Sequence, residues 1–182
     1  MEETLGKAVQ KETPFQNITM VLIFVYGTLK RGQPNHCEMT TAKNGKAEYQ
    51  GRGHTVVKFP LVIAGKYNIP FLLNVPGSGH HVKGEIYSVD NEMLQFLDKF
   101  EECPHLYQRT LEKVKIEEWE GASDLSADLP VGSIGEFFIY TTKLYSPEYL
   151  KLDCHENYDA YGAHGLTYTE RINRNVDWPF NI

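Results

Sequence analysis

Six consecutive apolar residues, Val21 to Tyr26, run directly into Gly27. Their β-branched and aromatic side chains favour a buried strand, and the glycine favours a tight turn immediately after it. A buried strand needs partners for its backbone N–H and C=O groups, so other segments must pair with it. The chain is therefore predicted to form a sheet in which this strand ends at a glycine turn.

Further short runs of apolar and β-branched residues follow, separated by turns rich in Gly, Pro and Asn. We expect strands at 54–58, 61–64, 71–75, 82–89, 107–119 and 134–141. Helices are expected at 36–42, 91–100 and 146–152, with Asp90 as the N-cap of the second. Many short strands with one clear helix predict an α+β fold, a small mixed β-barrel flanked by short helices.

Charge and composition narrow the classes of function. The 182 residues suit one domain, and the net charge of −6 comes without any basic block. Such a chain lacks the electrostatic footprint of a nucleic-acid binder, so we expect a small molecule as its partner. No run of about 18 apolar residues exists, so no membrane span is expected. Residues 1–19 lack an apolar core and predict a flexible tail rather than a secretory signal.

The cysteine and histidine patterns argue against a disulfide framework and against a metal site. Cys37, Cys103 and Cys154 are an odd, widely spaced set with no CxxC pair. Sparse cysteines of this kind are typical of a reducing compartment, so we expect a cytoplasmic protein. The seven histidines have no metal-ligand spacing, and we expect no metal and no cofactor.

One acidic residue lies where an apolar one would be expected. Within the predicted helix, the apolar positions 93, 94, 96, 97 and 100 form one arc, and Glu101 falls inside that arc, four residues after Leu97. If the helix frays at Phe100, Glu101 is a solvated end residue or an ion-pair partner of a Lys or Arg. If it does not, Glu101 is a partly buried carboxylate with a raised pKa, suited to accept and return a proton. Tyr107 and Arg109 follow it closely and could shape a pocket, or could simply occupy strand faces.

The turn Tyr26-Gly27-Thr28-Leu29 is a second candidate site. Backbone N–H groups that leave the end of a strand have no ladder partner and can bind an anion or an oxyanion. Gly27 removes the side chain that would block a close approach. The same four residues are also compatible with an ordinary turn, and the glycine spacing matches no phosphate-binding loop.

Extended sequence blocks resemble the γ-glutamylcyclotransferase-like family. The opening block is Phe24-Val25-Tyr26-Gly27-Thr28-Leu29-Lys30-Arg31-Gly32, and further blocks lie at 33–36, 60–65, 68–70, 76–79, 82–87, 97–101, 103–104, 106–109 and 164–166. The resemblance implies one domain over 20–174, with tails at 1–19 and 175–182. It also implies a β-barrel whose cavity is lined by the loop 26–29, with Glu101 as the acid/base.

The same resemblance implies an activity. A lyase of this family would cyclise L-γ-glutamyl amines, with γ-glutamyl-ε-lysine from protein crosslinks as our first choice of substrate. The products would be 5-oxoproline and the free amine. Apart from the resemblance, we expect a monomer. Two alternatives stay open: a cyclotransferase for γ-glutamyl-α-amino acids or glutathione, and a binding module that keeps the fold without catalysis.

Overall fold

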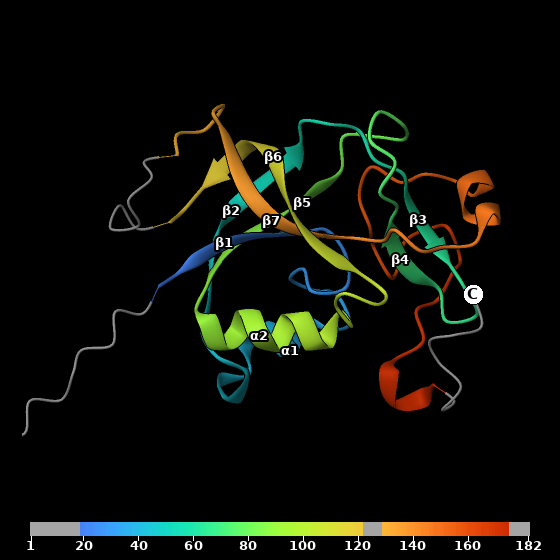
Figure 1. Cartoon of the computed structure of the whole chain (residues 1–182), viewed down its shortest axis with the longest axis horizontal. Coiled ribbons are helices and arrows are strands. Elements are labelled where there is room, and N and C mark those ends of the chain that lie inside the picture. Colours follow the sequence, from blue (N-terminus) through green and yellow to red (C-terminus); the bar gives the residue numbers. More distant parts are fainter. Residues whose placement is uncertain (1–18, 122–128, 175–182) are drawn as a thin grey trace, which may run out of the picture.

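A closed five-stranded barrel forms the body of the protein (Figure 1). The computed structural model describes residues 19–121 and 129–174, so the tails expected at 1–19 and 175–182 lie outside the described residues, apart from Thr19. The barrel order is β1 (Val21–Val25), β5 (Lys83–Val89), β2 (Ala47–Thr55), β6 (Gln108–Trp119) and β7 (Ile134–Thr141). Neighbouring strands are antiparallel except at the closure, where β7 pairs with β1 in parallel. The predicted α+β barrel is confirmed.

The strand β2 was only partly predicted. A strand was expected at 54–58, but β2 begins at Ala47 and ends at Thr55. Gly51 and Gly53 weaken the local strand signal, although both are required by packing. A Cβ at Gly53 would lie 2.2 Å from the carbonyl oxygen of Lys115, and one at Gly51 would lie 2.0 Å from that of Glu118. Close approach of β6, with a register shift between Arg52 and Gly53, therefore selects glycine here.

A two-stranded sheet lies beside one end of the barrel (Figure 1). It consists of β3 (Leu61–Ala64) and β4 (Ile69–Leu72). Backbone hydrogen bonds at the end of β4 join it to the end of β7: Thr142 N–H donates to the carbonyl of Leu72, and Asn74 N–H donates to that of Thr142. The strand expected at 71–75 thus begins two residues earlier and ends at Leu72. Asn74, which was expected to belong to this strand, instead bonds to the end of β7.

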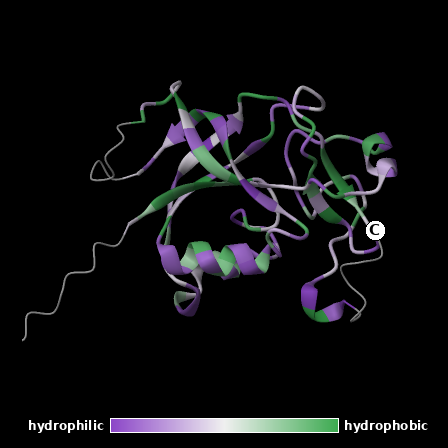
Figure 2. Ribbon diagram, viewed as in Figure 1, coloured by the Kyte–Doolittle hydropathy of each residue, from purple (hydrophilic) through white to green (hydrophobic). Residues whose placement is uncertain are grey.

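The helix α2 (Asn91–Phe100) lies along the outside of the barrel (Figure 1). Its N-cap is Asp90, as predicted, because the Asp90 side chain accepts a hydrogen bond of 2.8 Å from the N–H of Met93. Figure 2 shows hydrophobic and hydrophilic residues alternating along α2, and Met93 and Leu97 are its buried residues. The remaining helices are short: α1 (His36–Thr40) and the 3₁₀ turns η1 (Ala42–Asn44), η2 (Pro147–Lys151) and η3 (Arg171–Asn173).

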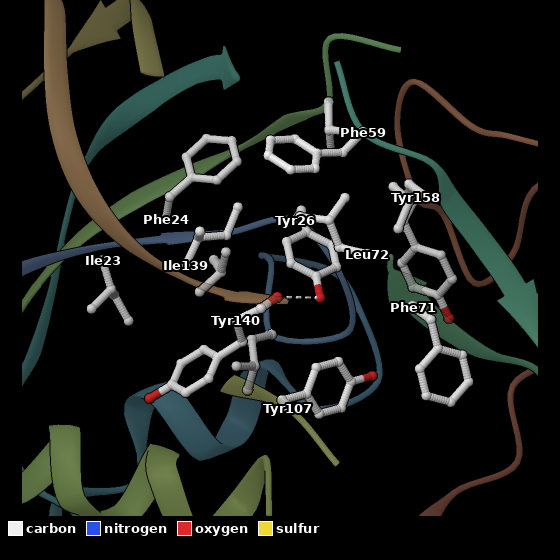
Figure 3. Packing of buried hydrophobic residues seen from close by; sticks show 14 of the residues in the cluster. Ile23, Phe24, Tyr26, Phe59, Phe71, Leu72, Tyr107, Ile139, Tyr140 and Tyr158 are labelled. Carbon is white, nitrogen blue, oxygen red and sulfur yellow. Dashed lines mark hydrogen bonds between the residues drawn. The ribbon is translucent and has the colours of Figure 1, made fainter. Parts of the chain in front are cut away.

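Aromatic side chains from distant parts of the chain meet in the core (Figure 3). The hydroxyl of Tyr26, at the end of β1, donates a hydrogen bond of 2.8 Å to the carbonyl of Tyr140 on β7. Tyr107 stacks against Phe71 with ring centroids 5.9 Å apart. The first contact joins the end of β1 to β7, and the second joins the residue before β6 to β4. None of the described helices combines the length and hydropathy that a bilayer crossing requires.

Candidate active site

A pocket forms where the end of β1 meets the end of α2 and the strand β4. We call it the central pocket, and its lining comes from six separate parts of the chain. It contains the predicted loop Tyr26–Leu29, the predicted acid/base Glu101 and Tyr107. The other lining residues are Phe24, Val25, Asn35, Ile69, Pro70, Leu106, Tyr140, Tyr168, Arg171 and Arg174.

Glu101 is the C-cap residue of α2, and its backbone N–H donates to the carbonyl of Leu97. The helical phase therefore continues through position 101 and directs this residue to the buried side of the helix. Burial raises the pKa of its carboxyl group to about 7. Arg171 and Arg174 act against this rise by favouring the charged form, and neighbouring Glu102 adds to it. A carboxyl group with such a pKa can exchange protons at neutral pH.

The loop Tyr26–Leu29 presents backbone to the pocket. It ends in a turn in which Lys30 N–H donates to the carbonyl of Gly27 at 3.2 Å. A Cβ at Gly27 would lie 3.1 Å from Cγ of Pro70, so glycine lets β4 approach the loop closely. Within the described ranges, the N–H groups of Gly27, Thr28 and Leu29 donate to no other group of the protein. Unpaired amides beside a pocket are able to bind an oxyanion or a carboxylate.

The structure separates the two residues that follow Glu101 in the sequence. Tyr107 lines the central pocket and donates a hydrogen bond of 3.1 Å from its hydroxyl to the carbonyl of Pro70. Arg109 is absent from the pocket lining among the described residues. Its guanidinium instead donates twice to the carboxylate of Asp98, at 2.8 and 2.9 Å, and Asp98 also accepts from the hydroxyl of Tyr140. Arg109 thus supports the pocket wall through Asp98 and Tyr140.

The C-terminal segment supplies pocket residues that the sequence patterns did not reveal. Thr169 N–H donates to the carbonyl of Tyr67 in the β3–β4 connection, which carries Tyr168 to the pocket. Asn35 donates from one amide group to the hydroxyl of Thr28 at 2.9 Å and to that of Tyr168 at 2.7 Å. The segment has little periodicity, and its place depends on contacts with residues far away in the sequence.

Two arginines complete this segment of the lining. Arg171 donates a hydrogen bond of 2.8 Å to the carbonyl of Phe100, and its guanidinium carbon lies 3.9 Å from the centre of the Phe100 ring. Arg174 donates from Nε to the carbonyl of Thr169 at 3.0 Å.

No group of three His, Cys, Asp or Glu side chains that could hold a metal ion occurs in the part of the chain described.

Known proteins match this chain over most of its length. The protein-family model described as gamma-glutamyl cyclotransferase, AIG2-like, matches residues 23–160. The chain is similar to gamma-glutamylaminecyclotransferase of Mus musculus, with 57% identity over 85% of this chain and 100% of the relative. The corresponding protein of Homo sapiens is 48% identical over 85% of this chain and 100% of the relative.

A solved structure shares the fold. The crystal structure of an AIG2-like protein from Mus musculus superposes with a TM-score of 0.78 at 55% identity, covering 85% of this chain and 99% of that one. The family model alone spans more than half of the sequence. The chain therefore belongs to the gamma-glutamyl cyclotransferase, AIG2-like family of enzymes.

Proposed function

We propose that this chain is a lyase-type cyclotransferase that converts L-γ-glutamyl amines into 5-oxoproline and the free amine. We assign γ-glutamyl-ε-lysine, the linkage found in protein crosslinks, as its substrate. The names of the mouse and human relatives support the reaction class. One observation carries the proposal: Glu101, with a pKa near 7, lines the same pocket as the backbone of the loop Tyr26–Leu29.

Glu101 acts as the base that makes the substrate nucleophilic. The α-ammonium of the glutamyl unit cannot attack until it loses a proton, which the Glu101 carboxylate accepts. The α-nitrogen then bonds to the γ-carbonyl carbon of the same molecule and closes a five-membered ring. Because both reacting groups belong to one molecule, the attack has an effective molarity of up to about 10⁵–10⁸ M.

The tetrahedral intermediate carries negative charge on the former carbonyl oxygen. Backbone N–H groups of the loop Tyr26–Leu29 stabilise this oxyanion, and one such donor contributes roughly 2.7–4 kcal/mol in comparable sites. As the C–N bond to the amine breaks, protonated Glu101 returns its proton to the leaving nitrogen. The α-nitrogen also gives up a second proton. The leaving amine takes up a second proton in turn, so it is released as an alkylammonium ion. No water is consumed and no net proton is released.

The proposal also covers the cellular location and the oligomeric state of the enzyme. Cys37, Cys103 and Cys154 are free thiols, which supports a reducing, cytoplasmic location. We also propose that the protein acts as a monomer.

The test compares Glu101→Gln with Glu92→Gln, which alters an exposed glutamate in the first turn of the same helix. Formation of 5-oxoproline from γ-glutamyl-ε-lysine should fall by about 10²–10⁴-fold in Glu101→Gln and stay unchanged in Glu92→Gln. Full activity of Glu101→Gln would refute the assigned role.

A substrate panel separates the alternatives. The wild-type protein should cleave γ-glutamyl-ε-lysine faster than γ-glutamyl-alanine or glutathione. Preference for either of the latter would replace the proposed substrate and retain the chemistry. Absence of 5-oxoproline from all three, together with a folded protein, would favour a binding module.

A further inference from the structure

The central pocket has more positive than negative side chains. Two guanidinium groups, those of Arg171 and Arg174, share it with a single carboxyl group, that of Glu101. The pKa of Glu101 near 7 leaves that group only partly ionised at neutral pH, whereas guanidinium groups stay charged. The described lining therefore has more cationic than anionic side chains, although the Arg171 guanidinium also lies 4.0 Å from the carboxylate of Glu102, just outside the lining.

The arginines do not act simply as counter-ions of Glu101. A carboxylate in a tight ion pair has a pKa well below its ordinary value. Burial raises the pKa of Glu101 despite the opposing influence of Arg171 and Arg174. The raised pKa of Glu101 is thus inconsistent with a tight ion pair at this carboxyl group, and the carboxylate oxygen that lies 4.0 Å from the Arg171 guanidinium belongs to Glu102.

Both guanidinium groups are already oriented. Arg171 is fixed by its hydrogen bond to the carbonyl of Phe100 and by its position over the Phe100 ring. Arg174 is fixed by its bond to the carbonyl of Thr169, and it lies 5.1 Å from the centre of the Tyr168 ring. A guanidinium has five N–H donors in a planar fork, so one bond sets its direction and its geometry still matches a carboxylate. Orientation before binding lowers the entropic cost of recognition.

The segment that bears the arginines is anchored to the loop Tyr26–Leu29. Asn35 joins Thr28 of that loop to Tyr168, and Thr169 bonds to Tyr67. Oxyanion donors, Glu101 and the arginines are thus held in one assembly. An L-γ-glutamyl group has three polar parts near its reacting end: the γ-carbonyl, the α-ammonium and the α-carboxylate. The loop binds the oxygen of the γ-carbonyl, and Glu101 accepts a proton from the α-ammonium. The remaining α-carboxylate is negatively charged and is attracted by the arginines.

We infer that Arg171 and Arg174 bind the α-carboxylate of the glutamyl unit and make the enzyme prefer substrates that carry it. The inference rests on the proposed function and extends it, because it names the part of the substrate that the C-terminal segment recognises. It predicts discrimination against an amide of 4-aminobutanoic acid. That compound keeps the nucleophilic amine and the same ring size but lacks the α-carboxylate, and it would cyclise to 2-pyrrolidinone.

The experiment measures kcat/KM for γ-glutamyl-ε-lysine and for its 4-aminobutanoyl analogue. Wild-type protein should prefer the first by at least about 10-fold, because charge-assisted hydrogen bonds contribute that much or more. Arg171→Met and Arg174→Met should each lower kcat/KM for γ-glutamyl-ε-lysine by about 10–100-fold, chiefly through KM, with little change for the analogue. Arg52→Met, which removes an exposed guanidinium paired with Glu118 on the barrel, is the matched control.

The outcomes separate the two proposals. A wild-type protein that releases no 5-oxoproline refutes the proposed function, and this inference falls with it. An active wild-type protein whose arginine variants keep the full preference for the α-carboxylate refutes the inference alone. Arg171→Lys and Arg174→Lys, with circular dichroism, guard against misfolding of the methionine variants, because they keep the charge and should retain part of the preference. Binding of 5-oxoproline, but not 2-pyrrolidinone, by the wild type and its loss in the variants provide a readout without turnover.

Discussion

The side-chain amide of Asn35 donates a hydrogen bond of 2.7 Å to the hydroxyl of Tyr168. The same amide also bonds to Thr28, so a single residue holds the glycine loop and the C-terminal segment together. Both partners line the central pocket. This side chain therefore contributes to the spacing between the loop amides and the two arginines.

Asn35→Ala should lower both stability and activity. Loss of two partly buried hydrogen bonds should reduce the free energy of unfolding by about 1–3 kcal/mol. The loop and the C-terminal segment should also move apart, which should lower kcat/KM for γ-glutamyl amines by about 10-fold or more. Urea unfolding and steady-state kinetics measure the two effects.

Gln33→Ala is the control for Asn35→Ala. Gln33 also joins the region after the loop to the C-terminal part, through Asp159 and the N–H of Ala160, but it does not line the pocket. Its loss should reduce stability to a similar extent and leave kcat/KM nearly unchanged. Equal losses of activity in the two variants would contradict a specific role for Asn35.

Arg109→Met tests the distinction between a residue that supports the pocket and one that binds substrate. The variant loses the two hydrogen bonds to Asp98, a partly exposed pair, and should be less stable by about 1–2 kcal/mol. Since Tyr140 still bonds to Asp98, kcat/KM should change by less than about 3-fold. This corresponds to a change of less than about 1 kcal/mol in the activation free energy. A loss of activity as large as that of Arg171→Met would place Arg109 in substrate recognition.

The pH dependence of kcat/KM should report the ionisation of Glu101. Because the free enzyme needs an ionised base, kcat/KM should fall as the pH drops below about 7. The charge of Glu102 raises the pKa of Glu101, so Glu102→Gln should move this acidic limb to lower pH. A pH profile that is identical in wild type and Glu102→Gln would argue against Glu101 as the titrating group.

Local patterns were sufficient to predict the first strand, the glycine turn and the helix with its cap. The Asp90 cap and the position of Glu101 depend on neighbours within one or two helical turns, and helical periodicity encodes such neighbours. The pairing of Glu101 with the loop Tyr26–Leu29 in one pocket came from the family resemblance, since no local pattern specifies it.

The missed features depend on contacts between distant segments. Ala47–Gly53 was missed because its glycines are selected by the carbonyls of β6 rather than by strand propensity. Tyr168, Arg171 and Arg174 were missed because their segment is positioned by Tyr67 and Asn35. Such side-chain and loop contacts leave no periodicity in the sequence, so pattern analysis has no signal for them.

Gly53→Ala tests the packing that explains the missed part of β2. The added methyl group would lie 2.2 Å from the carbonyl oxygen of Lys115, so backbone must shift and the free energy of unfolding should fall by about 3 kcal/mol or more. Gly77→Ala is the control, because a Cβ there meets nothing within 4 Å and only its positive φ of 95° opposes alanine. That variant should lose roughly 1 kcal/mol. Equal losses in urea unfolding would contradict the packing explanation.

The raised pKa of Glu101 should make stability depend on pH in a direction opposite to that of an ion-paired carboxylate. Its pKa is about 7 in the folded protein, against an ordinary value of 4.5 that applies to the unfolded chain. Between these two pH values the folded protein binds more protons than the unfolded chain, so the free energy of unfolding falls as the pH rises. The contribution of this one group amounts to at most about 3 kcal/mol.

Glu101→Gln isolates this contribution. The variant should lack the decrease between pH 4.5 and pH 7, and at pH 8 it should be more stable than the wild type by up to about 3 kcal/mol. Other groups also titrate in this range: burial raises the pKa of Glu112 and lowers that of His155, whose effects on stability are opposite in sign. Both groups are present in wild type and variant, so the difference between the two proteins, measured by urea unfolding at pH 4.5 and pH 8, removes them. A difference that is the same at both pH values would show that Glu101 ionises normally, and the observation that carries the proposed mechanism, its raised pKa, would then be wrong.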